Sequence, residues 1–133
     1  MADYFGHWLK VGAATKSENL PKIFFVNWFR RDEDGRFMWP GYGENSRVLK
    51  WIFDRVDGNA NATKTAIGYL PSPADIDITG LNVTDADMNA LLSIDSEGWK
   101  SALPQMRDHY AQFGAKLPAP LTTALNELES SLK

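Results

Sequence analysis

The chain has 133 residues, a formal net charge of −3, 44% hydrophobic residues, 23% charged residues and no cysteine. This composition is typical of one soluble globular domain and excludes a disulfide framework, a cysteine metal site and a thiolate nucleophile. The N-terminus does not resemble a signal peptide, and no apolar run approaches the roughly eighteen residues of a membrane span, so we expect a cytoplasmic protein with no membrane partner. The basic residues are mixed with acidic ones, so we expect no nucleic-acid partner.

The first half of the chain predicts two helices and a pair of strands. Apolar residues at near-helical spacing predict a short helix over residues 3–15. The β-branched and aromatic run 22–29 predicts a buried strand, and Asp34-Gly35 predicts a turn before a second short strand over 37–39. A helix is expected over 45–56. The apolar stripe of that helix comprises Val48, Leu49, Ile52, Phe53 and Val56.

The second half predicts one more short strand and three more helices. The strand spans residues 65–70, and a capping-box-like start at Thr84 opens a helix that ends near residue 92. A helix over 95–113 contains Pro104, which should kink or split it. The last helix starts near Pro118. The inward apolar residues expected on the first and last of these helices are Met88, Leu91 and Leu92, and Leu121, Leu125, Leu128 and Leu132. The predicted fold class is α+β, or irregular α/β, with short strands and several helices.

The segment 27–51 holds six aromatic residues, most of them among residues that form turns and loops. Rings held on turns, rather than on the buried face of a helix, are typical of a lined binding pocket. The alternative is that these rings cover the edge of a hydrophobic core.

Residues that could carry catalysis are sparse. The loop Gly41 to Ser46 has glycines before a helix, but it lacks the lysine of a phosphate-binding loop, and Glu44 would repel phosphate. His7 and His109 are about a hundred residues apart and are interpreted as structural or surface residues. The acidic run 32–34 is typical of a solvated turn. The sequence therefore predicts no catalytic constellation and no metal site, and favours binding.

Asn45 is the candidate for choosing a base. Aromatic rings stack on any flat heterocycle, whereas a side-chain amide carries both an acceptor and donors and can distinguish guanine from adenine. The alternative, favoured by position alone, is that Asn45 is only the N-cap of the helix that follows.

The run FVNWFRRDEDGRFMWPGYGENSRVLKWIFDR closely resembles the guanine-binding segment of GTP-dependent phosphoenolpyruvate carboxykinases. The resemblance extends to DYFGHWL, LPKIF and IGYLP, and more loosely to the end of the chain. It implies the C-terminal part of the nucleotide-binding lobe of a larger enzyme, with residues 1–133 as a single guanine-recognising domain and residues 1–2 as an artificial start.

Carried over by position, the residues that hold the guanine base are Phe29, Phe37, Tyr42 and Asn45. Many family members have phenylalanine where this chain has Tyr42; a tyrosine ring can still stack. Pro104 falls where relatives run an uninterrupted helix, which puts that helix in question and not the base pocket.

The resemblance also implies an activity: conversion of oxaloacetate and GTP to phosphoenolpyruvate, GDP and carbon dioxide, a lyase reaction of gluconeogenesis that uses Mn²⁺ or Mg²⁺. The catalytic residues and metal ligands are expected outside this chain, which alone should be inactive. The expected partners are a guanine nucleotide and the rest of the same enzyme, and exposed apolar surface would favour self-association. The alternatives are a stand-alone nucleobase-binding module and an aromatic protein-interaction domain.

Overall fold

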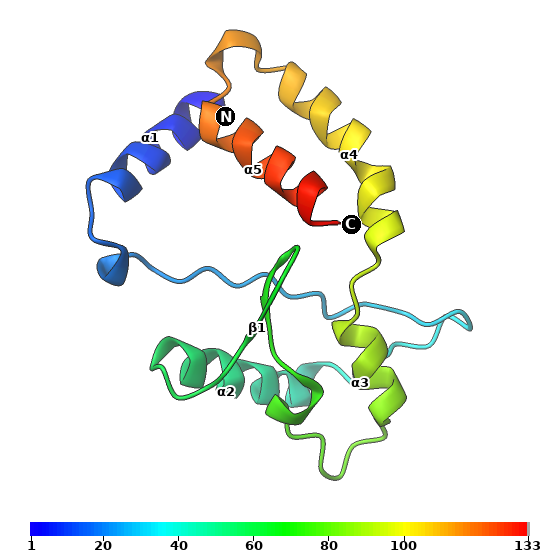
Figure 1. Cartoon of the computed structure of the whole chain (residues 1–133). Helices are drawn as coiled ribbons and strands as arrows, with labels where there is room; N and C mark the ends of the chain where they lie inside the picture. Colours follow the sequence, from blue (N-terminus) through cyan, green and yellow to red (C-terminus); the bar gives the residue numbers. More distant parts are fainter. Residues whose placement is uncertain (133) are drawn as a thin grey trace. The chain divides into compact units, whose positions relative to one another are not determined.

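The computed structural model describes residues 1–132. The chain divides into two compact units, one made of residues 1–21 and 95–133 and the other of residues 22–94. The described residues form five α-helices and one two-stranded antiparallel sheet, which confirms the α+β class (Figure 1). None of the described helices is long and apolar enough to span a bilayer.

The first unit is helical. It contains α1 (Ala2–Ala13), α4 (Ser96–Ala111) and α5 (Ala119–Ser131). Arg107 of α4 donates to the Asn126 side chain of α5 at 3.2 Å and also pairs with Glu129. The leucine stripe predicted for the last helix is confirmed, since Leu125 and Leu132 are buried and Leu121 and Leu128 are half-buried.

The helix predicted over residues 3–15 is confirmed as α1, and its apolar stripe is exposed, with Tyr4 and Trp8 each more than half accessible. Pro104 was predicted to kink or split its helix; the split does not occur, because α4 is one continuous helix from Ser96 to Ala111. A proline in a helix removes one backbone hydrogen bond. Burial of the preceding Leu103 favours keeping the helical path despite that loss.

The second unit carries the remaining elements. These are a 3₁₀ turn at Tyr42–Glu44, α2 (Asn45–Val56), β1 (Thr63–Thr65), β2 (Gly68–Leu70) and α3 (Asp85–Leu92). The predicted strand over 65–70 is instead a tight hairpin, in which Thr63 faces Leu70 and Thr65 faces Gly68. The core of this unit consists of Trp39, Trp51, Ile76, Val83 and Met88.

Helix α2 has the bounds that were predicted, but only part of its predicted stripe is covered. Val48 and Ile52 pack against the core, whereas Leu49, Phe53 and Val56 are exposed. The buried residue of this helix is Trp51. The face of α2 that meets the core therefore carries Val48, Trp51 and Ile52.

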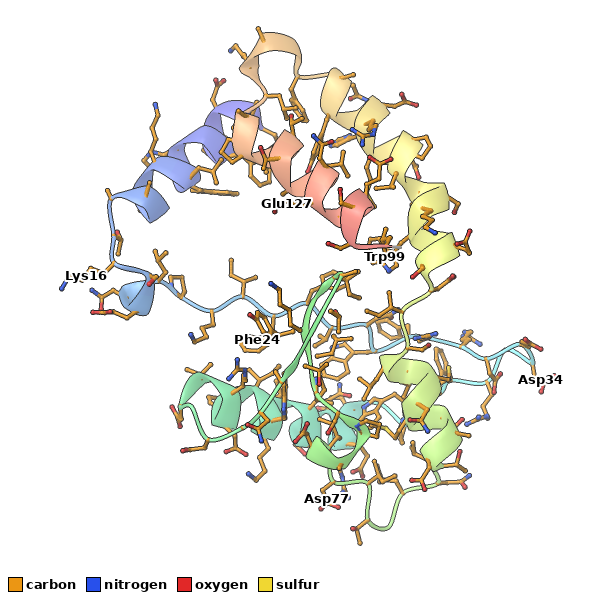
Figure 2. The ribbon with its side chains drawn as sticks, in the orientation of Figure 1. Lys16, Phe24, Asp34, Asp77, Trp99 and Glu127 are labelled. Carbon is orange, nitrogen blue, oxygen red and sulfur yellow. The ribbon has the colours of Figure 1, made fainter. Side chains whose placement is uncertain are left out.

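The strand predicted over 22–29 is absent: this segment is irregular, and Ile23 and Phe25 are 92% and 96% exposed. Phe24, labelled in Figure 2, points the other way, and its ring meets Trp51 edge to face at 6.1 Å. The prediction of a strand over 37–39 is also wrong, since this segment forms only one isolated bridge, between Arg31 and Phe37. A segment with high strand propensity forms a strand only when a neighbouring strand is present to hydrogen-bond with it. Residues 22–29 have no such neighbour within the described residues.

Candidate functional site

Two of the predicted base-binding rings lie in contact. Phe29 and Phe37 flank the turn at Asp34-Gly35, and their ring centroids are 6.4 Å apart with the planes at 63°. Phe29 is 73% exposed and Phe37 is 45% exposed. The Arg31 guanidinium covers one face of Phe37 at 3.8 Å, a cation–π contact. The pair is therefore accessible to a ligand, and one face of Phe37 is already occupied.

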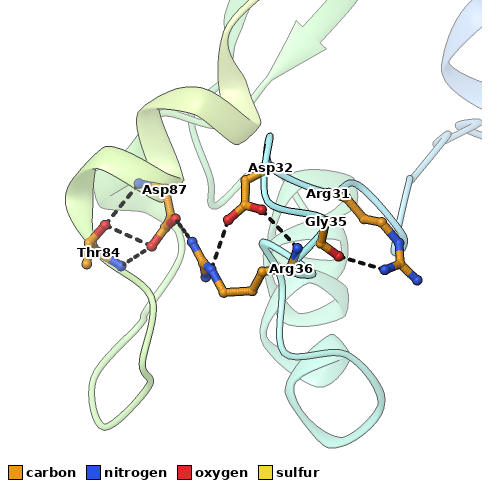
Figure 3. A network of polar contacts seen from close by, with 6 residues as sticks. All are labelled: Arg31, Asp32, Gly35, Arg36, Thr84 and Asp87. Carbon is orange, nitrogen blue, oxygen red and sulfur yellow. Dashed lines mark hydrogen bonds and ion pairs between the residues drawn. The ribbon is translucent and has the colours of Figure 1, made fainter.

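The turn between these rings is tied to helix α3 by a polar network (Figure 3). Asp32 accepts from the backbone N–H and the Nε of Arg36, both at 2.9 Å. The Nη2 of Arg36 reaches Asp87 Oδ1 at 2.7 Å. The other oxygen of Asp87 accepts from the backbone N–H and the hydroxyl of Thr84, which completes the predicted capping box of α3. One carboxylate thus caps the helix and anchors the turn that carries Phe37, while Asp34 lies at the outer tip (Figure 2).

Protonation of Asp87 should loosen this anchor at low pH. The backbone N–H of Thr84, followed by Arg36, lowers the pKa of Asp87 to about 2, from an ordinary value of about 3.9. Because the folded-state pKa is depressed, the stabilisation is complete above about pH 4 and is lost as the pH falls through about 2. We expect the NMR signals of the Thr84 amide and the Arg36 side chain to shift together in that window. The variant Asp87→Asn should remove the transition; an unchanged Arg36 titration in that variant would contradict the assignment.

The loop after the second ring depends on Gly41. Its φ of 81° and ψ of −163° lie in a region open essentially only to glycine. The 3₁₀ turn Tyr42–Glu44 follows, and Tyr42 is 97% exposed. Arg47 of α2 holds the end of this turn by pairing with Glu44 at 2.6 Å. The backbone at Gly41 therefore sets where the Tyr42 ring emerges.

We expect Gly41→Ala to destabilise the second unit by about 1–3 kcal/mol, because alanine is strained at this backbone conformation. Gly43→Ala is the matched control, since no atom lies within 4 Å of the added methyl group and Gly43 has no positive φ. Urea unfolding of the two variants measures the difference. Equal stabilities would show that the loop relaxes freely around Gly41.

Asn45 does not cap α2, so the capping interpretation is wrong. Helix α2 has no side-chain cap, and the carboxamide of Asn45 instead accepts a hydrogen bond from the Trp39 indole, with 3.0 Å between Nε1 and Oδ1. Trp39 is 5% exposed and belongs to the core. A buried indole N–H needs an acceptor, and Asn45 provides one.

The ring pair fits a stacked ligand only after adjustment. A base held between two parallel faces needs them about 7 Å apart, twice a carbon–carbon contact distance. Phe29 and Phe37 are closer than this and steeply tilted, so one ring must turn, or the base must stack on one ring alone. The residues do not fit a metal ion: among positions 1–132, no group of three or more histidine, aspartate or glutamate side chains could hold one.

All four residues predicted for base binding lie in the second unit. The structure pairs Phe29 with Phe37, places Tyr42 on the exposed turn before α2 and puts Asn45 against Trp39. Sequence reasoning missed the role of Trp39 and the cover of Arg31 over Phe37. For Trp39, the only signal in the sequence was that a tryptophan, if buried, needs an acceptor for its indole N–H.

Aromatic rings left exposed on turns can stack on a flat ligand, and the Asn45 carboxamide can hydrogen-bond to one. Comparison with known proteins identifies the family. The model described as "Phosphoenolpyruvate carboxykinase C-terminal P-loop domain" matches residues 1–131, and the chain belongs to this family.

Named relatives agree with this assignment. The chain is 54% identical over 133 residues to "Phosphoenolpyruvate carboxykinase [GTP]" of Treponema pallidum, with 99% of this chain covered. Proteins of the same name from Neocallimastix frontalis and Chlamydia trachomatis are 49% and 47% identical, with 100% of this chain covered in each case. The chain spans 22% of the length of each of these relatives.

Proposed function

We propose that this chain contributes the guanine-base pocket of a GTP-dependent phosphoenolpyruvate carboxykinase, and that residues 1–133 form one guanine-recognising domain. In this proposal Phe29, Phe37 and Tyr42 stack on the base and Asn45 hydrogen-bonds to its edge. The observation that carries it is the exposed Phe29–Phe37 pair on a turn fixed to α3. The relatives named for GTP share this part of the chain.

The whole protein would convert oxaloacetate and GTP to phosphoenolpyruvate, GDP and carbon dioxide, as a cytoplasmic lyase of gluconeogenesis. Mn²⁺ or Mg²⁺ would be bound by residues outside this chain. His7 and His109 are both exposed, which fits their interpretation as surface residues. The 133-residue chain should therefore show no carboxykinase turnover alone.

The affinity of the isolated chain for GTP should be low. A stacked base contributes about 1–3 kcal/mol per aromatic contact, whereas association costs roughly 4–15 kcal/mol in lost freedom. The Phe29–Phe37 pair must also open or rotate. We expect binding in the millimolar range, with the phosphate contacts of the whole enzyme supplying the remainder.

The rest of the enzyme is the proposed partner of the exposed segment 22–26. Ile23 and Phe25 lie on it almost fully exposed, next to Phe24, which packs inward. In the isolated chain the same exposed side chains would favour self-association. Sedimentation over a range of concentrations measures this tendency.

An amide NMR titration with GTP, and with ATP as control, tests the proposed function. We expect GTP to shift Phe29, Phe37, Tyr42 and Asn45 and ATP to shift Asn45 less. Equal effects of both nucleotides would favour a general nucleobase-binding module. Concentration-dependent broadening with no nucleotide effect would favour a protein-interaction domain. A GTP response confined to other residues would contradict the assigned pocket.

A further inference from the structure

The indole of Trp39 fixes the orientation of the Asn45 carboxamide. Trp39 packs in the core with Trp51 and Met88, so its ring cannot turn without opening the core. Its N–H donates to Asn45 Oδ1 at 3.0 Å. If the amide turned over, its Nδ2 donor would meet the indole donor and leave a buried N–H without an acceptor, which is costly. The amide is therefore held with its oxygen toward the core.

The nitrogen end of the same amide is left available. Within residues 1–132, the Nδ2 group of Asn45 makes no hydrogen bond to another protein group. Asn45 is half-buried, at the point where the exposed turn Tyr42–Glu44 joins α2. A ligand at this turn can therefore accept from the Nδ2 donor, while one of the two lone pairs of Oδ1 is already engaged by the indole.

We propose that Trp39 is a specificity-determining positioning residue, which selects guanine by holding the donor end of Asn45 toward the base. This inference rests on the proposed function. Guanine carries a carbonyl oxygen at C6 and accepts from a donor, whereas adenine carries an amino group there and would meet donor with donor. A carboxamide free to turn over could hydrogen-bond to either base. The hydrogen bond from the indole fixes the carboxamide in the one orientation that favours guanine.

The variant Trp39→Phe keeps an aromatic ring in the core and removes the donor, together with part of the buried indole ring. In the free protein, we expect the Asn45 Nδ2 amide signals to change from ordered to mobile in ¹⁵N relaxation measurements. The ratio of GTP to ATP affinity should fall roughly tenfold, the amount expected for one discriminating hydrogen bond, while ATP binding stays the same or rises. Trp51→Phe is the matched control, because that buried indole donates instead to the Asn61 carbonyl at 3.3 Å.

A second variant keeps the test decisive if Trp39→Phe does not fold. Asn45→Asp leaves the core intact and replaces the donor end with an acceptor, so the preference should move from GTP toward ATP. An ordered Asn45 amide in Trp39→Phe, or an unchanged GTP preference in either variant, would overturn the role of Trp39. A wild-type protein with no preference for GTP would contradict the proposed function instead.

Discussion

Trp51→Ala is expected to destabilise the second unit by about 3–5 kcal/mol, the cost of removing a large aromatic side chain from a core. Trp51 is the buried residue of α2, its ring contacts Phe24 edge to face, and its indole donates to Asn61. The substitution removes these interactions together and leaves a cavity. Because small domains are stable by only about 5–15 kcal/mol, much of the fold stability would be lost. Urea unfolding followed by far-UV circular dichroism measures the change.

Phe53→Ala is the control for this prediction. Phe53 lies on the same helix and is 69% exposed, so its removal should change stability by no more than about 0.5 kcal/mol. Similar losses in the two variants would mean that α2 buries a different face from the one described, or that Phe53 is covered by another copy of the chain.

Phe37→Ala and Phe29→Ala should each weaken GTP binding by about 1–3 kcal/mol, or roughly 5- to 150-fold. ATP binding should weaken in parallel, because stacking does not choose the base. Both rings are accessible, so their removal should leave the stability of the fold nearly unchanged. Nucleotide titration of each variant, with unfolding measured alongside, separates a loss of binding from a loss of structure.

Phe25→Ala is the matched control, since Phe25 is also an exposed phenylalanine, on the segment that precedes Phe29. It should leave nucleotide binding unchanged. If Phe25→Ala weakens GTP binding as much as Phe37→Ala, the base does not lie between the rings proposed here. The exposed segment 22–26 would then be the ligand surface.

Helices could be predicted from this sequence where local signals agree. Thr84 and Asp87 form the capping box expected from their spacing, and α2 starts and ends as predicted. The apolar run 22–29 could not be predicted correctly, because a strand needs a neighbour and local propensity does not reveal whether one is present. Periodicity correctly marked α1 as a helix with an apolar face, but it does not say what covers that face.

The site was predictable only in part, and through resemblance. The contact between Phe29 and Phe37 follows from the turn at Asp34-Gly35, which brings the two flanks together. The partner of Asn45 did not follow from position. Position favoured an N-cap, whereas the need of the buried Trp39 indole for an acceptor decides where the carboxamide points. The Trp39 indole and the backbone N–H groups at the start of α2 compete for the Asn45 carboxamide oxygen. The sequence alone does not show which of these donors is buried and therefore needs that oxygen most.

A crystal structure with GTP bound, of this chain or of a longer protein that contains it, would test the guanine pocket most directly. We predict that the guanine ring contacts Phe29, Phe37 and Tyr42, that its C6 carbonyl oxygen lies within hydrogen-bonding distance of Asn45 Nδ2, and that Trp39 still donates to Asn45 Oδ1. A base bound elsewhere, with these rings left in solvent, would contradict the proposed pocket. A base that meets the oxygen of the Asn45 carboxamide would contradict the role given to Trp39.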